Sequence, residues 1–148
     1  MATRLHGLAG ILIRDTLTDQ SMDYSKALDT LSTKPMIAPC YIIIGGSNPS
    51  EAAVITRNRL SAVDIWHINN TDKWYILETN YDHWNSPPKS DNRREPAVEA
   101  TNKIGKDHIN MHTLYQVLST PPILNNKTAY TTIMSTHHGL YYTTIRHP

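Results

Sequence analysis

A run of five apolar residues, Cys40 to Ile44, constrains the fold of this chain more than any other feature. Isoleucine and tyrosine dominate the run, which favours a strand, and a continuous apolar run is typical of a strand covered on both faces. Gly45 and Gly46 follow and predict a tight turn. Ala52 to Thr56 is then the predicted return strand. The sequence therefore predicts an antiparallel sheet near the middle of the chain.

Two helices are predicted before this sheet. Residues 5–17 place leucine and isoleucine near helical spacing, although two glycines weaken the pattern. Residues 23–32 repeat apolar side chains at i, i+3, i+4 and i+7, and Ser21 or Asp23 is positioned to cap the helix. Pro35 predicts the end of this helical stretch.

Beyond the first hairpin, the apolar pattern predicts more strands and two more helices. Strands at residues 62–68 and 73–78 are joined by the turn-rich quartet 69–72, which predicts a second hairpin. A helix with Pro96 in its first turn and a helix from Asn110 follow.

The chain is predicted to close with a hairpin of strands at residues 128–134 and 140–146. This order predicts an α+β domain with a mostly antiparallel sheet and flanking helices.

Composition excludes several classes of protein. The chain has 148 residues, 39% hydrophobic and 18% charged, which indicates a globular chain. The formal net charge is +1 and the arginine clusters are interrupted, which argues against nucleic-acid binding. No apolar run approaches the roughly 20 residues of a transmembrane helix. The single cysteine excludes an intrachain disulfide.

Several candidate sites have an ordinary structural interpretation. Cys40 begins an apolar strand with no basic residue within five positions, so a small buried side chain is favoured over a catalytic thiol. His108 and His112 stand four apart but lack the glutamate of a zinc-protease motif, and surface histidines are favoured over a metal site. The sequons at Asn69 and Asn126 matter only if the chain enters the secretory route.

A polar constellation at the predicted strand ends is the strongest remaining candidate. It consists of residues 56–59, 79–82 and 91–94. An asparagine amide can donate to an oxyanion, and a guanidinium can bind a carbonyl or carboxylate. An Asx-turn at Asn80 with a structural arginine–carboxylate pair explains the same residues equally well. Neither interpretation supplies a nucleophile.

Several longer motifs carry a resemblance to a known family. The stretches "YIIIGGSNPSEAAVITRNR", "DIWHINNTDKWYILETNYDHW", "SDNRR" and "LSTPPILNNKTAYTTIM" closely resemble the C-terminal half of the catalytic β subunit of the N-acylethanolamine acid amidase and acid ceramidase family. The likeness runs from about Ile11 to the end, and residues 1–10 match poorly. By this resemblance, residues 1–148 are a single partial domain.

The resemblance implies an amino-terminal-nucleophile hydrolase with an αββα sandwich. It implies a lysosomal enzyme that hydrolyses the fatty-acyl amide bond of N-acylethanolamines or ceramide without a cofactor or metal. By motif, Asn80 matches the asparagine at the oxyanion and Arg93 matches an active-site arginine, while Tyr81 and Asp82 are expected to bind substrate or support the site. The motifs do not decide between the two substrates.

The resemblance also implies what these residues lack. The family's nucleophilic cysteine belongs to an upstream stretch of the catalytic subunit, and Cys40 does not match it. The expected partners are the lipid substrate, the upstream part of the catalytic subunit and the α subunit. Peripheral contact with a membrane surface is also compatible with the resemblance. The first hypothesis is therefore a lipid amidase portion that is inactive alone. The alternative is a non-catalytic domain of the same fold that binds lipid or a partner.

Overall fold

A computed structural model describes residues 7–70, 72 and 74–146 of the chain. The chain divides into two compact units, Met1–Ile76 and Leu77–Pro148. Each unit contains two α-helices and an antiparallel sheet in its described part. The predicted α+β class with antiparallel strands and flanking helices is confirmed.

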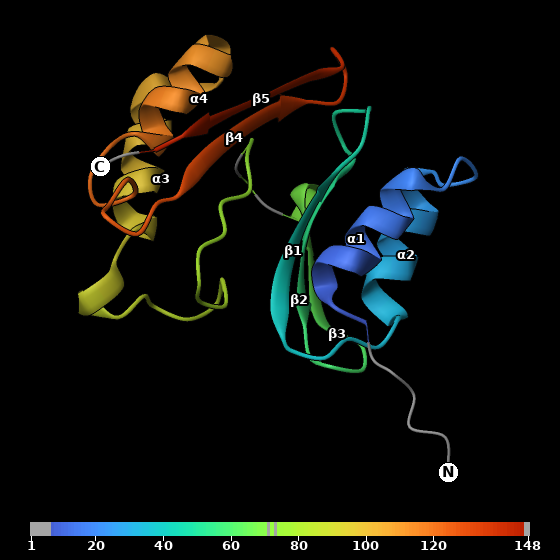
Figure 1. The fold of residues 1–148 in the computed structure, drawn as a ribbon. Coiled ribbons are helices and arrows are strands. Elements are labelled where there is room, and N and C mark those ends of the chain that lie inside the picture. The colour runs from blue at the N-terminus through green and yellow to red at the C-terminus, as the bar shows by residue number, and fades with distance from the viewer. Residues whose placement is uncertain (1–6, 71, 73, 147–148) are drawn as a thin grey trace. The chain divides into compact units, whose positions relative to one another are not determined.

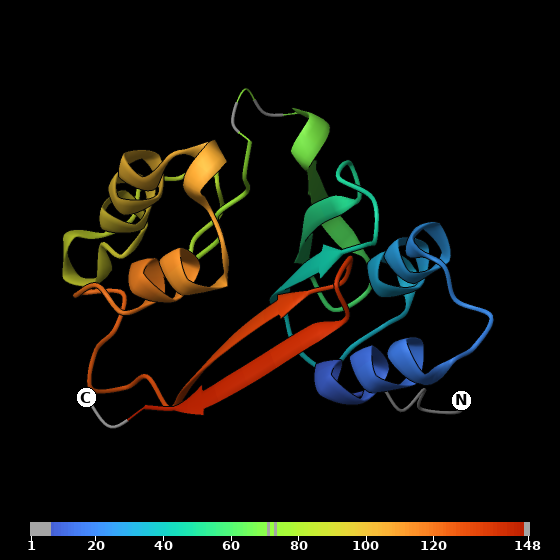
Figure 2. The same cartoon turned by 90° about the horizontal axis from the view of Figure 1, so that it is seen from above.

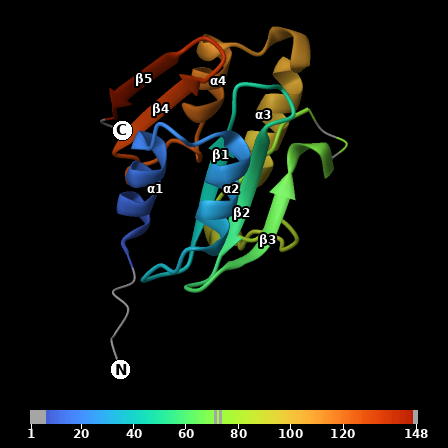
Figure 3. The same ribbon diagram turned by 90° about the vertical axis from the view of Figure 1, so that its right-hand side faces the viewer.

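The first unit packs two helices on one face of a three-stranded sheet (Figure 1). Its core consists of Leu31, Met36, Ile42 and Ile55, which are at most 5% exposed. Figure 3 shows α2 lying over this sheet. The elements in chain order are α1 (Ala9–Thr18), α2 (Tyr24–Thr33), β1 (Cys40–Gly45), β2 (Ala52–Arg57) and β3 (Ala62–His67).

The apolar strand β1 is an edge strand of this sheet. The sheet order is β1-β2-β3, with β1 antiparallel to β2 and β2 antiparallel to β3. Ile42 is 5% exposed and faces the core, whereas its neighbour Ile43 is 70% exposed. The expectation of a strand covered on both faces is wrong, because successive side chains point to opposite faces and the helices cover one face.

A buried arginine joins α2 to the sheet. Arg57, at the end of β2, is 2% exposed. Its guanidinium donates hydrogen bonds to the carbonyl oxygens of Leu31 and, at 2.6 Å, Lys34. Carbonyls at a helix C-terminus lack partners within the helix and carry partial negative charge, so they suit a buried cation. At the other end of α2, the Asp23 carboxylate caps the helix by accepting from the Lys26 backbone N–H at 2.8 Å.

The predicted strand at residues 73–78 is wrong over its described part, residues 74–78, which pair with no strand. One turn of 3₁₀ helix, Ile68–Asn70, follows β3. The Glu78 carboxylate accepts the Thr79 backbone N–H at 2.7 Å, a local hydrogen bond that competes with strand pairing. Thr71 and Lys73 of the predicted hairpin lie outside the described residues.

In the second unit, one helix packs on a face of a hairpin and a second helix packs against the first (Figure 2). Thr131 and Ile133 of the hairpin are buried. The elements are α3 (Arg94–Ile104), α4 (Met111–Leu118), β4 (Tyr130–Ser135) and β5 (Leu140–Ile145). The last two helices and the last hairpin of the sequence analysis are therefore confirmed. No helix in the described residues is long and apolar enough to cross a membrane.

Turn and cap residues set the ends of these elements. Asn110 caps α4 by accepting the backbone N–H groups of His112 and Thr113, and Thr113 returns a bond to the Asn110 N–H at 2.9 Å. This reciprocal arrangement is a capping box. Gly139 turns the hairpin with a φ of 62°, a backbone conformation that favours glycine.

The hairpin leaves one apolar face uncovered. In β4, Tyr130 and Met134 alternate with the buried residues and are exposed, while Thr132 between them is partly exposed, as expected for a period of two. Across this face, Thr132 and Thr143 form a hydrogen bond of 2.9 Å. The large apolar members of the face are Tyr130, Met134, Tyr141 and Ile145, between 59% and 73% exposed. This set is called the outer hairpin face below.

Candidate functional site

A groove in the second unit brings together residues that are distant in the sequence. Asn80 lines it from the loop Leu77–Asn85, and Arg93 lines it from the position before α3. The groove is open and has a volume of ≈ 1050 Å³. The two residues that the family resemblance selects therefore share one concave surface. Further lining residues are Lys89, Asp91, Asn126, Lys127 and Tyr130.

Arg93 is held in the groove by a carboxylate. Its Nε lies 2.6 Å from Asp91 Oδ1 and its Nη2 lies 2.9 Å from Asp91 Oδ2, a bidentate pair. The Tyr81 hydroxyl donates to the same carboxylate at 3.0 Å. Hydrogen bonds from Arg93 and then Tyr81 lower the pKa of Asp91 below its usual value, and the bond to Asp91 raises the pKa of Arg93. The arginine–carboxylate pair that the sequence analysis left open is present, and it orients an arginine that still faces the groove.

Arg94 points to the loop instead of the groove. Its Nη1 donates to the Asn85 carbonyl at 2.8 Å, and its Nη2 donates to the carbonyls of Tyr81 and, at 3.2 Å, Asp82. Nη2 also lies 3.6 Å from Glu78 Oε1. The Glu78 side chain is 1% exposed, and burial raises the pKa of its carboxyl group. Adjacent arginines thus take different roles, which their sequence does not reveal.

Asp82 closes a turn after Asn80. The Asn85 backbone N–H donates to the Asp82 carbonyl at 2.9 Å, and the Asn85 side-chain amide donates to the Asp82 carboxylate at 3.2 Å. Asn80 itself is exposed, and none of the hydrogen bonds found in the described part of the chain involves its side-chain amide. The Asx-turn interpretation of Asn80 therefore has no hydrogen bond to support it, while Asp82 has the bonds of a supporting residue.

Cys40 lies in the first unit, partly buried in β1. Burial raises the pKa of its thiol, and the nearby Arg57 only partly opposes this effect. Strand register places Arg57 opposite Cys40, so a basic neighbour exists that sequence spacing missed. A thiol with a raised pKa forms less thiolate and is a weaker nucleophile at acid or neutral pH.

The histidine and glycosylation candidates are at the surface. His108 and His112 are both exposed, and no group of three or more potential metal ligands exists among the described residues. Asn69 is exposed, but Thr71 of its sequon lies outside the described residues. Asn126 is exposed and lines the groove that contains Asn80.

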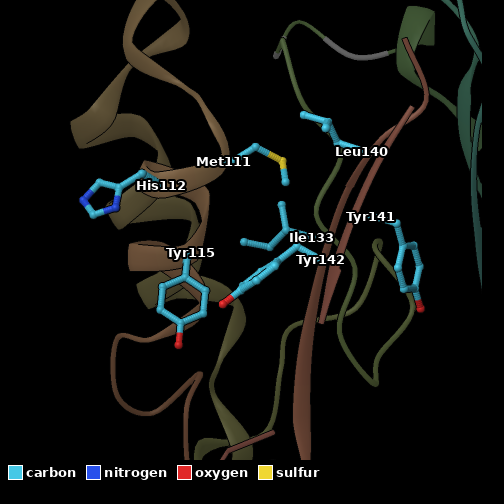
Figure 4. Close-up of a pocket in the computed structure, with 7 residues that line it drawn as sticks. All are labelled: Met111, His112, Tyr115, Ile133, Leu140, Tyr141 and Tyr142. Atoms are coloured by element: carbon cyan, nitrogen blue, oxygen red, sulfur yellow. The ribbon is translucent and has the colours of Figure 1, made fainter. Parts of the chain in front are cut away.

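A second, apolar cavity of ≈ 570 Å³ lies between α4 and the hairpin. Figure 4 shows the Tyr142 ring directed toward Tyr115, with Ile133 and Met111 beside them, while His112 points outward. Arg146 lies over the Tyr115 ring, 4.7 Å from its centroid. The sequence analysis did not find this cavity. Alternating apolar residues in β4 and the apolar face of α4 were its only signal.

Sequence reasoning missed two residues that shape the site. Glu78 was assigned to a strand, and Arg94 was given no role, although the family motif selected its neighbour Arg93. The pattern DNRR showed that charged residues cluster before α3, but only the structure shows which guanidinium lines the groove and which binds the loop.

The comparison with solved structures defines the class of protein first. The chain is similar to the N-acylethanolamine-hydrolyzing acid amidase ortholog of Caenorhabditis elegans, with a TM-score of 0.72, 34% identity, and coverage of 85% of this chain and 53% of that chain. The fold is therefore that of the amino-terminal-nucleophile hydrolases, as predicted.

Curated relatives then give the family. The chain is 47% identical to the N-acylethanolamine-hydrolyzing acid amidase of Rattus norvegicus over 145 residues, 97% of this chain and 40% of that protein. It is 38% identical to the acid ceramidase of Homo sapiens over 138 residues, 93% of this chain and 35% of that protein. No family model matches the chain.

The chain belongs to the family of N-acylethanolamine-hydrolyzing acid amidase and acid ceramidase, as the motifs predicted. It spans about two fifths of the length of the curated relatives that it matches.

Proposed function

We propose that this chain forms the oxyanion-binding part of a lysosomal lipid amidase. The observation that carries the proposal is the shared groove, which is lined both by the exposed residue Asn80 and by Arg93, whose guanidinium is oriented by Asp91. In the proposed reaction, a cysteine thiolate attacks the carbonyl carbon of a fatty-acyl amide. The Asn80 N–H stabilises the oxyanion that forms, and Arg93 binds a polar group of the substrate.

The proposed nucleophile comes from a polypeptide segment other than these 148 residues. Burial raises the pKa of the Cys40 thiol, so Cys40 does not suit the role. The proposed partners are the remaining part of the catalytic subunit, the α subunit and the lipid substrate. By relationship to the acid amidases, the proposed substrates are N-acylethanolamines, with ceramide as the other candidate.

A complementation experiment tests this proposal. A chimera would join this chain to the region of the Rattus norvegicus relative that the chain does not match. We expect the chimera to release fatty acid from an N-acylethanolamine or ceramide at acid pH, and the 148-residue chain alone to release none. Turnover by the chain alone would contradict the need for an external nucleophile, and an inactive chimera that is folded would contradict the amidase role.

Replacing Asn80 tests its role in the reaction. In the active chimera, Asn80→Ala should lower kcat by roughly 10² to 10³ with a small change in KM, because an oxyanion donor acts mainly in the transition state. Asn102→Ala, in the exposed part of α3, is the matched control and should leave kcat unchanged. An unchanged kcat for Asn80→Ala would remove Asn80 from the site.

The alternative function is non-catalytic binding of an apolar ligand or partner. The apolar cavity between α4 and the hairpin and the outer hairpin face are the observations that favour it. The same chimera discriminates the two functions, because a binding domain would leave it folded and inactive.

A further inference from the structure

We propose that Glu78 and Arg94 form a buried brace that positions the Asn80 side chain. The inference rests on the proposed function of Asn80 and deepens it. Both residues act through the loop Leu77–Asn85 and are positioning residues, since neither lines the groove with Asn80.

Arg94 holds the loop on the C-terminal side of Asn80. Its guanidinium bonds to three main-chain carbonyls, those of Tyr81, Asp82 and Asn85. Its side chain is only 14% exposed. A planar guanidinium can bind several acceptors in fixed directions, which a lysine ammonium cannot match. One residue at the start of α3 therefore fixes the course of the chain immediately after Asn80.

Glu78 holds the loop on the N-terminal side of Asn80. Its Oε1 accepts the Thr79 backbone N–H at 2.7 Å and lies 3.6 Å from Arg94 Nη2. The carboxylate thus links the two residues before Asn80 to the guanidinium that holds the residues after it. Burying a carboxylate is unfavourable unless a cation or hydrogen bonds compensate it. The Glu78–Arg94 pair meets that condition in part: Arg94 Nη2 lies beside Glu78 Oε1, while Glu78 Oε2 and Arg94 Nε are buried with no hydrogen-bond partner among the described residues.

The brace leaves Asn80 as an exposed residue between two anchored ones. Tyr81 makes two of the anchoring hydrogen bonds. Its carbonyl oxygen accepts from the Arg94 guanidinium, and its hydroxyl donates to the Asp91 carboxylate. The Asp91 carboxylate in turn holds Arg93. The brace therefore sets the distance between the Asn80 side chain and the Arg93 guanidinium. The proposed reaction needs this distance to be fixed. A misplacement of about 1 Å at a catalytic group is enough to lower a rate by about 10²-fold.

Hydrogen–deuterium exchange in the full chain tests the brace without any enzyme assay. In Arg94→Lys and Glu78→Ala, the backbone amide of Asn85, which donates to the Asp82 carbonyl, should exchange at least about tenfold faster, while α4 and the first unit keep their protection. Glu99→Ala, an exposed carboxylate on α3, is the matched control and should change neither region. Unchanged exchange in the loop for both brace variants would overturn the proposal.

Kinetics in the chimera test whether the brace acts on Asn80. We expect Arg94→Lys to lower kcat by about 10- to 100-fold with KM nearly unchanged. Glu78→Gln keeps an acceptor for the Thr79 amide and should restore most of the rate lost in Glu78→Ala. A normal kcat in Glu78→Ala with a loosened loop would overturn the positioning role. An inactive chimera with a loosened loop would contradict the proposed function and leave the brace supported.

Discussion

At Asn80 the side chain is exposed while the residues on both sides of it are anchored. The local sequence places this asparagine among aromatic and charged residues. It left two roles for Asn80 equally good, an Asx-turn and a donor to an oxyanion. In the structure Asp82 and Asn85 make the turn, and Asn80 lines a groove with Arg93. The oxyanion role of Asn80 stays a prediction. Contacts between residues 78 and 94 are side-chain contacts across a loop, and no sequence period encodes them.

The pKa of Glu78 predicts a pH dependence of stability. Burial raises this pKa above the ordinary value of 4.5, while the hydrogen bond from the Thr79 backbone N–H, and then Arg94 and His83, oppose the shift and Asp82 adds to it. A raised pKa in the folded state means that protonation favours the folded state. The contribution to the free energy of unfolding is therefore fully present below about pH 4.5 and lost as pH rises through the folded-state pKa.

Urea unfolding between pH 4 and pH 7 measures this effect. Trp84 is the only tryptophan of the second unit, so its indole NMR signal reports that unit alone. We expect Glu78→Gln to reduce the decline of the free energy of unfolding over this pH range, because glutamine does not ionise. An identical decline in both proteins would assign the pH dependence to other groups.

At the scale of elements, capping and alternation predicted most of the secondary structure. Of the two predicted cap candidates before α2, Ser21 and Asp23, the cap is Asp23. Asn110, predicted as the start of a helix, is the cap of α4. The segment 74–78 was mistaken for a strand because aromatic and apolar residues favour strands only where a neighbouring strand is available. The last residue of this segment, Glu78, instead contacts the Thr79 backbone N–H and the Arg94 guanidinium.

The cap of α4 predicts a measurable difference between two variants at one position. Asn110→Ala should lower the free energy of unfolding of the second unit by about 1 kcal/mol, because it removes the acceptor for two backbone N–H groups. Asn110→Gly should cost only a few tenths of a kcal/mol, since glycine is itself tolerated at this position. The Trp84 signal in urea measures both. Equal losses would show that the capping bonds do not stabilise α4.

At the scale of the whole molecule, the outer hairpin face is an exposed apolar surface. Tyr130, Met134, Tyr141 and Ile145 lie on one side of β4 and β5. A contiguous apolar surface marks either an interface or a tendency to associate. The hypothesis that the chain is a partial domain also predicts an exposed apolar surface. That hypothesis stays a prediction.

Two substitutions on this face test its effect on association. The double variant Met134→Thr, Tyr141→Thr should remain monomeric at concentrations where the unmodified chain self-associates in analytical ultracentrifugation, because it removes apolar area while keeping strand-forming residues. Gln116→Thr, Lys127→Thr is the control at two exposed polar positions and should behave like the unmodified chain. Self-association of the Met134→Thr, Tyr141→Thr variant would place the contact elsewhere.

The sequence by itself determined the class, the family, and the order of helices and strands apart from the wrong strand at residues 73–78, because periodicity, caps and motifs are local or linear properties. Tertiary structure alone decided that β1 is an edge strand, that Arg57 lies opposite Cys40, and that Arg93 and Arg94 face different ways. Each of these depends on which distant atoms come within about 3 Å, and that distance is set by packing and not by spacing along the chain.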